Sequence, residues 1–268
     1  MAFAALVAGA GGFASPAPQR PRPRWPARSH ALDRIDPLGA HGGPRLTYGM
    51  KLGHSTRGRT IRATAYGNGR ATRRMLVVGC IHGTECAGTG VVRQLLAGCP
   101  PAHVDVWTIR NLNPDGHALG VRVNGRGVDL NRNFPAGWRP GGRAWDPEYP
   151  GPRPFSEPET RIVRRLVLRL RPQITVWFHQ QADPLVRAWG RSIPVARSYA
   201  LWSGLRFARM PWLSGTAPHW QNELRGGGSS FVVELPQRSL SHAERVRLAA
   251  ALERIAGYRG QSSQDLAR

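Results

Sequence analysis

Lysine is almost absent from this chain, since Lys51 is the only one, and acidic residues are few. The 38 basic and 16 acidic residues give a formal net charge of +22, which is carried almost entirely by arginine. The arginines are scattered along the chain and form no block with interleaved aromatic residues, the pattern typical of nucleic-acid-binding surfaces. The composition therefore indicates no specific nucleic-acid partner. It allows attraction to anionic cell-wall polymers, but a genomic preference for arginine over lysine explains the same bias at least as well.

Cysteines are also scarce, and their count limits the disulfides. The three cysteines, Cys80, Cys86 and Cys99, are an odd number, which excludes a complete disulfide framework and allows at most one bridge. The apolar run at residues 1–14, MAFAALVAGAGGFA, is too short to span a membrane. It resembles the apolar region of a signal peptide, so we expect a secreted, periplasmic or cell-wall protein, or a cytoplasmic one if the run is not a signal.

Three regions follow from the distribution of proline, arginine and apolar residues. Residues 1–44 join the signal-like run to a segment crowded with proline and arginine, which has little apolar surface to bury and predicts a disordered linker. Residues 45–258 contain the apolar segments and predict one folded domain. Residues 259–268 are predicted to be a flexible tail.

Apolar segments of strand length alternate with helical patterns in the folded region. Strands are predicted at residues 74–79, 104–112, 173–179 and 230–235. The polar segment 113–154 is too long for an ordinary connection and is typical of a functional or disordered loop. The alternation predicts an α/β fold of a single domain, with a mixed, largely parallel twisted sheet sandwiched by helices.

Three helices are predicted between these strands. The first covers residues 86–97 and is followed by Gly98 and Pro100. The other two begin at serines that have a glutamate three residues later, the spacing of a capping box, in the pairs Ser156 with Glu159 and Ser241 with Glu244.

The segment GCIHGTECAG, residues 79–88, raises the question of a metal site. His82 and Glu85 stand three residues apart, after a predicted strand and at the start of a helix, which can bring both side chains to one side. A catalytic zinc ion commonly has three protein ligands and keeps a fourth position for water. The pair by itself is equally well explained by a surface histidine and a glutamate favoured by the helix dipole. The two flanking cysteines also leave a thiolate site open.

Polar residues in unusual surroundings follow further along the chain. His179 ends the apolar run ITVWF, and Glu234 lies within FVVEL, where a carboxylate is costly to bury without a partner. An ordinary hydrogen-bonded histidine and an ion pair would explain these two as well. The polar segment 113–135 contains Arg122, Asp129, Asn131 and Arg132. Arginine and asparagine side chains together can bind a carboxylate through paired hydrogen bonds, and a solvated polar loop would explain the segment as well.

Five motifs in one order resemble a known family. HGTE, NPDG, GVDLNRNFP, a strand ending in histidine and a strand bearing glutamate resemble the zinc carboxypeptidases of the carboxypeptidase A type, over roughly residues 47–257. The resemblance implies one zinc ion per chain, bound by His82, Glu85 and His179. It also implies that Glu234 is the general base in the hydrolysis of a C-terminal peptide or amide bond by metal-activated water.

The same resemblance implies roles for the polar segment. Arg122 would polarise the carbonyl that is attacked, and Asn131 and Arg132 would bind the free carboxylate of the substrate. Asp129 would orient the zinc ligand His82. With three ligands implied, Cys80 and Cys86 are interpreted as small packing residues, or one of them as half of a bridge to Cys99.

The segment before Glu234 departs from the digestive members of the family. It lacks their tyrosine, since Tyr199 lies in an unrelated context, and it resembles the bacterial murein peptide amidases, which cleave between D-glutamate and diaminopimelate. His219 and Trp220 could line its substrate pocket, but a tryptophan in a glycine-rich loop often only packs, so neither is assigned to the site. The expected substrate is therefore a peptide or muropeptide with a free C-terminal carboxylate. Alternatives are a general carboxypeptidase, an N-acyl amino acid deacylase and a non-catalytic basic wall-binding protein.

Overall fold

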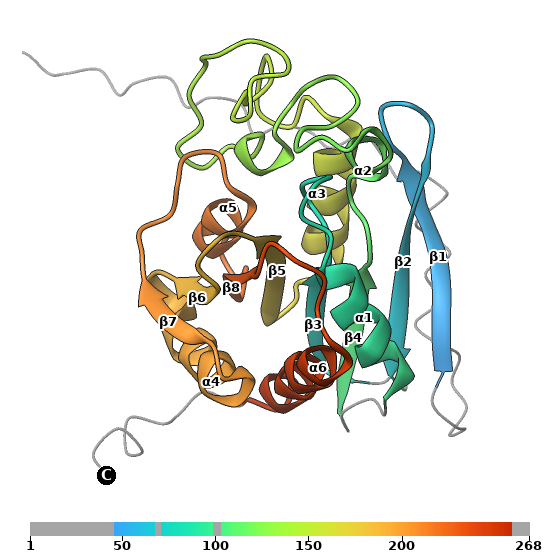
Figure 1. Cartoon of the computed structure of the whole chain (residues 1–268), viewed down its shortest axis with the longest axis vertical. Coiled ribbons are helices and arrows are strands. Elements are labelled where there is room, and N and C mark those ends of the chain that lie inside the picture. Colours follow the sequence, from blue (N-terminus) through green and yellow to red (C-terminus); the bar gives the residue numbers. More distant parts are fainter. Residues whose placement is uncertain (1–45, 68–70, 99–102, 259–268) are drawn as a thin grey trace, which may run out of the picture. The chain divides into compact units, whose positions relative to one another are not determined.

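The computed structural model of the protein describes residues 46–67, 71–98 and 103–258 (Figure 1). The predicted linker 1–44, the predicted tail 259–268 and Cys99 lie outside these ranges. Within them, no helix has both the length and the apolar character that a membrane crossing requires.

One mixed sheet of eight strands forms the centre of the fold, in the order β1-β2-β4-β3-β5-β8-β6-β7. The strands are β1 (Leu46–His54), β2 (Thr60–Gly67), β3 (Arg73–Val78), β4 (Val104–Ile109), β5 (Ile174–Gln180), β6 (Leu185–Ala188), β7 (Arg206–Arg209) and β8 (Ser229–Leu235). Strands β4, β3, β5 and β8 are parallel, whereas β1–β2, β2–β4 and β6–β8 are antiparallel. The predicted mixed, largely parallel sheet is confirmed.

Six α-helices accompany the sheet in the described part of the chain. They are α1 (Gly88–Ala97), α2 (Pro114–Leu119), α3 (Pro158–Leu170), α4 (Ile193–Ser203), α5 (Ala217–Glu223) and α6 (His242–Ala256), with short 3₁₀ turns η1 (Leu130–Arg132) and η2 (Gly190–Ser192). Helix α6 packs against both α1 and α4, as Figure 1 shows.

The main core lies between the sheet and helices α1, α4 and α6. Val176 and Phe178 of β5 and Val233 of β8 belong to it. Successive side chains of a strand point to opposite faces. His179 and Glu234, each one residue further along its strand, therefore project from the other face. Helix α5 lies on that face, where its Gln221 donates a hydrogen bond to Thr175 of β5. The packing of the core thus decides which face carries the candidate site.

One of the two predicted capping boxes is wrong. Helix α3 begins at Pro158, whose fixed φ suits a first helical position, and the residue before it is Glu157. Ser156 donates a hydrogen bond to Glu157 (2.7 Å), and the Glu159 carboxylate instead accepts from the backbone N–H of Thr56 (2.8 Å). The second capping box, Ser241 with Glu244 at the start of α6, is confirmed.

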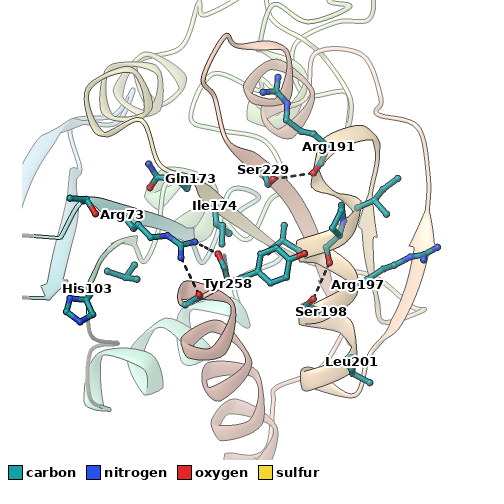
Figure 2. A pocket seen from close by; sticks show the side chains of 16 residues that line it. Arg73, His103, Gln173, Ile174, Arg191, Arg197, Ser198, Leu201, Ser229 and Tyr258 are labelled. Carbon is teal, nitrogen blue, oxygen red and sulfur yellow. Dashed lines mark hydrogen bonds between the residues drawn. The ribbon is translucent and has the colours of Figure 1, made fainter. Parts of the chain in front are cut away.

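A large cavity lies at the amino ends of the parallel strands (Figure 2). It measures about 1330 Å³, and its lining includes Arg73, Ile174 and Ser229 at the starts of β3, β5 and β8, with residues of α4. The Arg73 guanidinium points into the lining and donates to the backbone carbonyls of Gly257 and Tyr258. The cavity therefore lies at the opposite end of the parallel strands from His179 and Glu234.

Candidate metal centre

The carboxyl ends of β3, β5 and β8 bring three chemically important segments together. His82 and Glu85 lie in the turn after β3, while His179 and Glu234 are the penultimate residues of β5 and β8. The register pairs His179 directly with Glu234, so the two side chains lie next to each other on the same face. In open α/β sheets, ligands bind beyond the carboxyl ends of the strands. The predicted site is therefore assembled where this topology expects a ligand.

The ligand atoms of His82, Glu85 and His179 converge on one point. Nδ1 of His82 lies 2.9 Å from Oε2 of Glu85 and 3.1 Å from Nδ1 of His179, and that nitrogen lies 3.0 Å from the same carboxylate oxygen. In a tetrahedral zinc site with bonds near 2.1 Å, ligand atoms stand roughly 3.4 Å apart. Two imidazoles and a carboxylate are a donor set that zinc prefers. A small outward shift of the three side chains would fit the ion.

This is the only group of metal-ligating side chains found in the described ranges. The residues are deeply placed, since His82 is 1% and His179 5% exposed. The turn itself depends on Gly83, because a Cβ atom there would lie 2.1 Å from the carbonyl carbon of Gly116. That close approach allows the Gly83 N–H to donate to the carbonyl of Arg122 (3.0 Å), which ties the HGTE turn to the polar segment.

Asp129 is fully buried behind His82, as predicted for a residue that orients a ligand. Its Oδ1 lies 2.9 Å from Nε2 of His82, which leaves Nδ1 of the ring for a metal ion. Burial raises the pKa of Asp129, but the charges of His82, Arg122 and Arg132 outweigh this and hold it well below its usual value. Asp129 is therefore ionised at neutral pH and fixes the orientation of the imidazole.

The charges on the candidate ligands are coupled in the same way. Burial lowers the pKa of His82, but the carboxylates of Asp129 and Glu85 raise it by more, so that the pKa lies above its usual value. Burial raises the pKa of Glu85, but hydrogen bonds from His179 and His82 dominate and hold it far below its usual value. Positive charge at this point is thus strongly stabilised. A divalent cation would meet a carboxylate that is already ionised.

Arg122 also reaches the candidate ligands. Its guanidinium donates to Oε1 of Glu85 and to Oδ2 of Asp129 (3.2 Å). The side chain is 30% exposed, so it can also reach a group that enters the pocket. The structure places Arg122 next to the candidate metal site, where its predicted role requires it.

Asn131 and Arg132 lie on the other side of the site, in the 3₁₀ turn η1. The amide nitrogen of Asn131 lies 3.3 Å from Nε2 of His179, and its carbonyl oxygen accepts from the N–H of Ala217 (2.9 Å). Arg132 donates to the backbone carbonyl of Asn131 (3.0 Å) and to the exposed carboxylate of Glu148 (2.7 Å). A carboxylate of a ligand can replace the exposed Glu148, so Arg132 is available to bind it. Asn131 also lies against the ring of His179 and so helps to hold this candidate ligand in place.

A cavity of about 220 Å³ joins all of these side chains except Asp129, which lies behind them. Its wall contains His82, Glu85, Arg122, Asn131, Arg132, His179, Gln180, Gln181, Arg187, Trp212, Leu213, Thr216, Pro218, Val232 and Glu234. The site therefore combines candidate metal ligands, a carboxylate that can act as a base, and three guanidinium groups in one small polar space.

Two contributors were not predicted from the sequence. Gln180 accepts from the Ala87 N–H (2.8 Å) and so links the end of β5 to the start of α1, beside the HGTE turn. Arg187 projects into the pocket from the short strand β6. Its segment, LVRA, has the signal that drew attention to Glu234, a charged residue among apolar ones, but it is too short to show a period.

Two suggestions about other residues are wrong. Trp220 is buried and packs against Phe134, with ring centroids 5.4 Å apart, and His219 lies 2.9 Å from Glu223, so neither belongs to the pocket wall. Cys80 and Cys86 form a disulfide with each other and not with Cys99. The turn between strand and helix brings their Cα atoms to 4.6 Å, within the range that a bridge requires, and the bridge encloses His82 and Glu85.

Comparison with known proteins gives the same family. A family model described as zinc carboxypeptidase matches residues 40–198, which include every residue discussed as a ligand or carboxylate-binding group. The match ends before β8. Glu234 is therefore connected to the family pattern by the register of the sheet and by its place in the pocket.

Murein peptide amidase A of Escherichia coli K12 is 36% identical over 121 residues, which are 41% of this chain and 49% of that protein. Carboxypeptidase B of Astacus astacus is 28% identical over 55% of this chain and 58% of its own length. The chain thus spans about half the length of these curated relatives.

The fold is shared with solved structures. The murein-tripeptide amidase of Escherichia coli O157 superimposes with a TM-score of 0.64 and 23% identity, over 85% of this chain and 97% of that one. Carboxypeptidase A of Helicoverpa armigera gives 0.66 at 16% identity, over 80% and 70%. A match over more than half of the chain, in a fold that solved carboxypeptidases share, shows that the protein belongs to the zinc carboxypeptidase family.

Proposed function

We propose that the protein is a zinc-dependent carboxypeptidase or amidase that hydrolyses the amide bond next to a free C-terminal carboxylate. The observation that carries the proposal is the single pocket that joins His82, Glu85 and His179 to Glu234 and to three arginines. A zinc ion bound there would lower the pKa of a water molecule and polarise a carbonyl group.

The other side chains of the pocket transfer the proton, stabilise the developing charge and bind the substrate. Glu234 accepts the proton of the attacking water and passes it to the leaving nitrogen. Arg122 donates hydrogen bonds to the carbonyl oxygen, on which negative charge develops during the attack. Asn131 and Arg132 hold the carboxylate of the terminal residue and so place the scissile bond beside Glu234.

We further propose peptidoglycan-type peptides as substrates, with the bond between D-glutamate and diaminopimelate as the one cleaved. Two named relatives support this, a murein peptide amidase by sequence and a murein-tripeptide amidase by fold. Tyr199 gives further support: it is fully buried in α4, so it cannot serve as the tyrosine of digestive carboxypeptidases. Assays of a muropeptide beside an ordinary hippuryl-type peptide separate this substrate from that of a general carboxypeptidase.

We also propose a location outside the cytoplasm, which the signal-like run at residues 1–14 supports. Attraction of the basic surface to wall polymers would keep the enzyme near this substrate. Recovery of the full-length chain, uncleaved, from the cytoplasm alone would contradict this location.

The test of the reaction is Glu234→Gln in protein loaded with zinc. The amide keeps the size of the side chain but cannot accept the proton, so we expect turnover to fall by about 10²- to 10⁴-fold with one zinc ion still bound. Glu253→Gln on α6, across the sheet, is the matched control and should retain wild-type turnover. Wild-type turnover in the Glu234 variant would remove this residue from the mechanism.

A further inference from the structure

Arg187 occupies an unusual place in the sheet. It lies in the four-residue strand β6 and is paired with Val232 of β8. Leu185, two residues earlier in β6, is paired with Glu234. Directly opposed residues of antiparallel strands share a face, and so do alternate residues of one strand. Arg187 therefore projects from the same face as Glu234, and it lines the same pocket.

Arg187 differs from the other two arginines of the pocket in its partners. Arg122 is paired with Glu85 and Asp129, and Arg132 with Glu148. No ion pair between described side chains includes Arg187, and its buried Nε has no hydrogen-bond partner. Burial lowers the pKa of Arg187, while the charge of Glu234 acts in the opposite direction. Arg187 as a whole is only partly buried, but its Nε–H is shielded from solvent without an acceptor, and such an unpaired donor is costly. An anionic partner from outside the chain, whose oxygens would accept from the guanidinium, is therefore expected.

Among the three arginines that line this pocket, Arg187 is the one to which the proposed reaction assigns no group. Asn131 and Arg132 take the terminal carboxylate, Arg122 takes the carbonyl oxygen, and Glu234 must remain free to accept a proton. The wall of the same pocket also includes the apolar residues Trp212, Leu213, Pro218 and Val232. Such a wall suits a chain of methylene groups.

The size of the pocket limits what can enter it. Its volume of about 220 Å³ is below the roughly 300–1,000 Å³ of pockets that hold drug-sized ligands. Its size suits one terminal residue, while the rest of a substrate would extend through the opening.

We propose that Arg187 is a specificity-determining residue that binds a second carboxylate, carried by the side chain of the substrate's terminal residue. The inference rests on the proposed function and narrows its substrate class to peptides that end in a dicarboxylic amino acid, diaminopimelate included. The guanidinium, with its two-pronged donor geometry, is suited to hold that carboxylate.

Two muropeptides test the inference, one ending in diaminopimelate and the other in lysine, which differs from diaminopimelate only by the missing side-chain carboxylate. We expect the wild-type enzyme to prefer diaminopimelate by about 10- to 100-fold in kcat/KM. Arg187→Gln should lose that preference through a higher KM for the diaminopimelate peptide, with little change for the lysine peptide. Arg187→Lys, which keeps the charge, should retain part of it.

Arg197→Gln is the matched control, because Arg197 is an arginine of α4 that lies over Phe207 and is absent from the pocket wall. Its preference should equal that of the wild type. If Arg187→Gln lowered kcat/KM equally for both peptides and shifted the pH dependence of kcat/KM, Arg187 would only position Glu234, and the inference would be overturned. A wild-type enzyme that cleaves both peptides equally would also overturn the inference.

Failure of the proposed function has a different signature. If zinc-loaded wild-type protein cleaves neither peptide, calorimetric titration with free diaminopimelate and free lysine still measures the pocket. Tighter binding of diaminopimelate that is lost in Arg187→Gln would support the second carboxylate site without the reaction. Equal affinities for the two amino acids would overturn it, whether or not the variants fold.

Discussion

The replacement Asp129→Asn isolates the charge that supports a candidate metal ligand. Oδ1 of Asp129 lies 2.9 Å from Nε2 of His82 and accepts from the backbone N–H of Asn131 (2.8 Å), while Oδ2 accepts from Arg122 (3.2 Å). Asparagine keeps the shape and one acceptor oxygen, so it can still accept from His82 and from the start of the 3₁₀ turn. What it removes is the negative charge that strengthens the imidazole as a ligand.

The structure indicates how large the effect should be. Residues that hydrogen-bond to a metal-ligating histidine typically change metal affinity by about 10- to 100-fold, which is about 1.4 to 2.7 kcal/mol. Asp129 is 0% exposed, so solvent screens its charge poorly and the full effect is expected. The unfolding free energy of the metal-free protein should fall by less than the free energy of zinc binding, because the hydrogen bonds to His82 and Asn131 remain available.

Competition for zinc between the metal-free protein and a chromophoric chelator measures this affinity at neutral pH. Asp115→Asn is the matched control. Asp115 is equally buried and accepts from Ser55 (2.9 Å) and from the N–H of Arg57 (2.8 Å), but it touches no candidate ligand. Zinc binding of wild-type strength in Asp129→Asn, or an equal loss in Asp115→Asn, would refute the reasoning.

Two further predictions concern stability. Ser241→Ala should cost about 1 kcal/mol of unfolding free energy in a urea titration, because it removes the cap of α6; an unchanged midpoint would contradict that role. Burial raises the pKa of Glu159 above its ordinary 4.5, so its contribution to stability is present below that pH and lost as pH rises through the folded pKa. The melting temperature of Glu159→Gln minus that of wild type should therefore rise from pH 4.5 to neutral, and a flat difference would count against it.

The sequence by itself determined the family, the candidate metal ligands and the central strands. The apolar runs of β3, β5 and β8 are long enough to be recognised, and each is followed or ended by a polar residue that a buried strand does not need. The motif order shared with zinc carboxypeptidases assigned His82, Glu85, His179 and Glu234 to one site, and the carboxyl ends of parallel strands are the place where such residues meet. Local order was sufficient for these residues, because each lies next to a strong strand signal.

The tertiary structure decided what depends on distant partners. Strand β6 is only four residues long, so only its pairing with β8 shows that Arg187 enters the pocket. Which cysteines meet depends on the geometry of the turn that holds Cys80 and Cys86. Glu159 has the spacing of a capping residue, but its carboxylate instead accepts from the backbone N–H of Thr56, which lies more than 100 residues earlier in the chain. Sequence spacing describes local competition for hydrogen bonds, and packing determines which partner is near enough to win it.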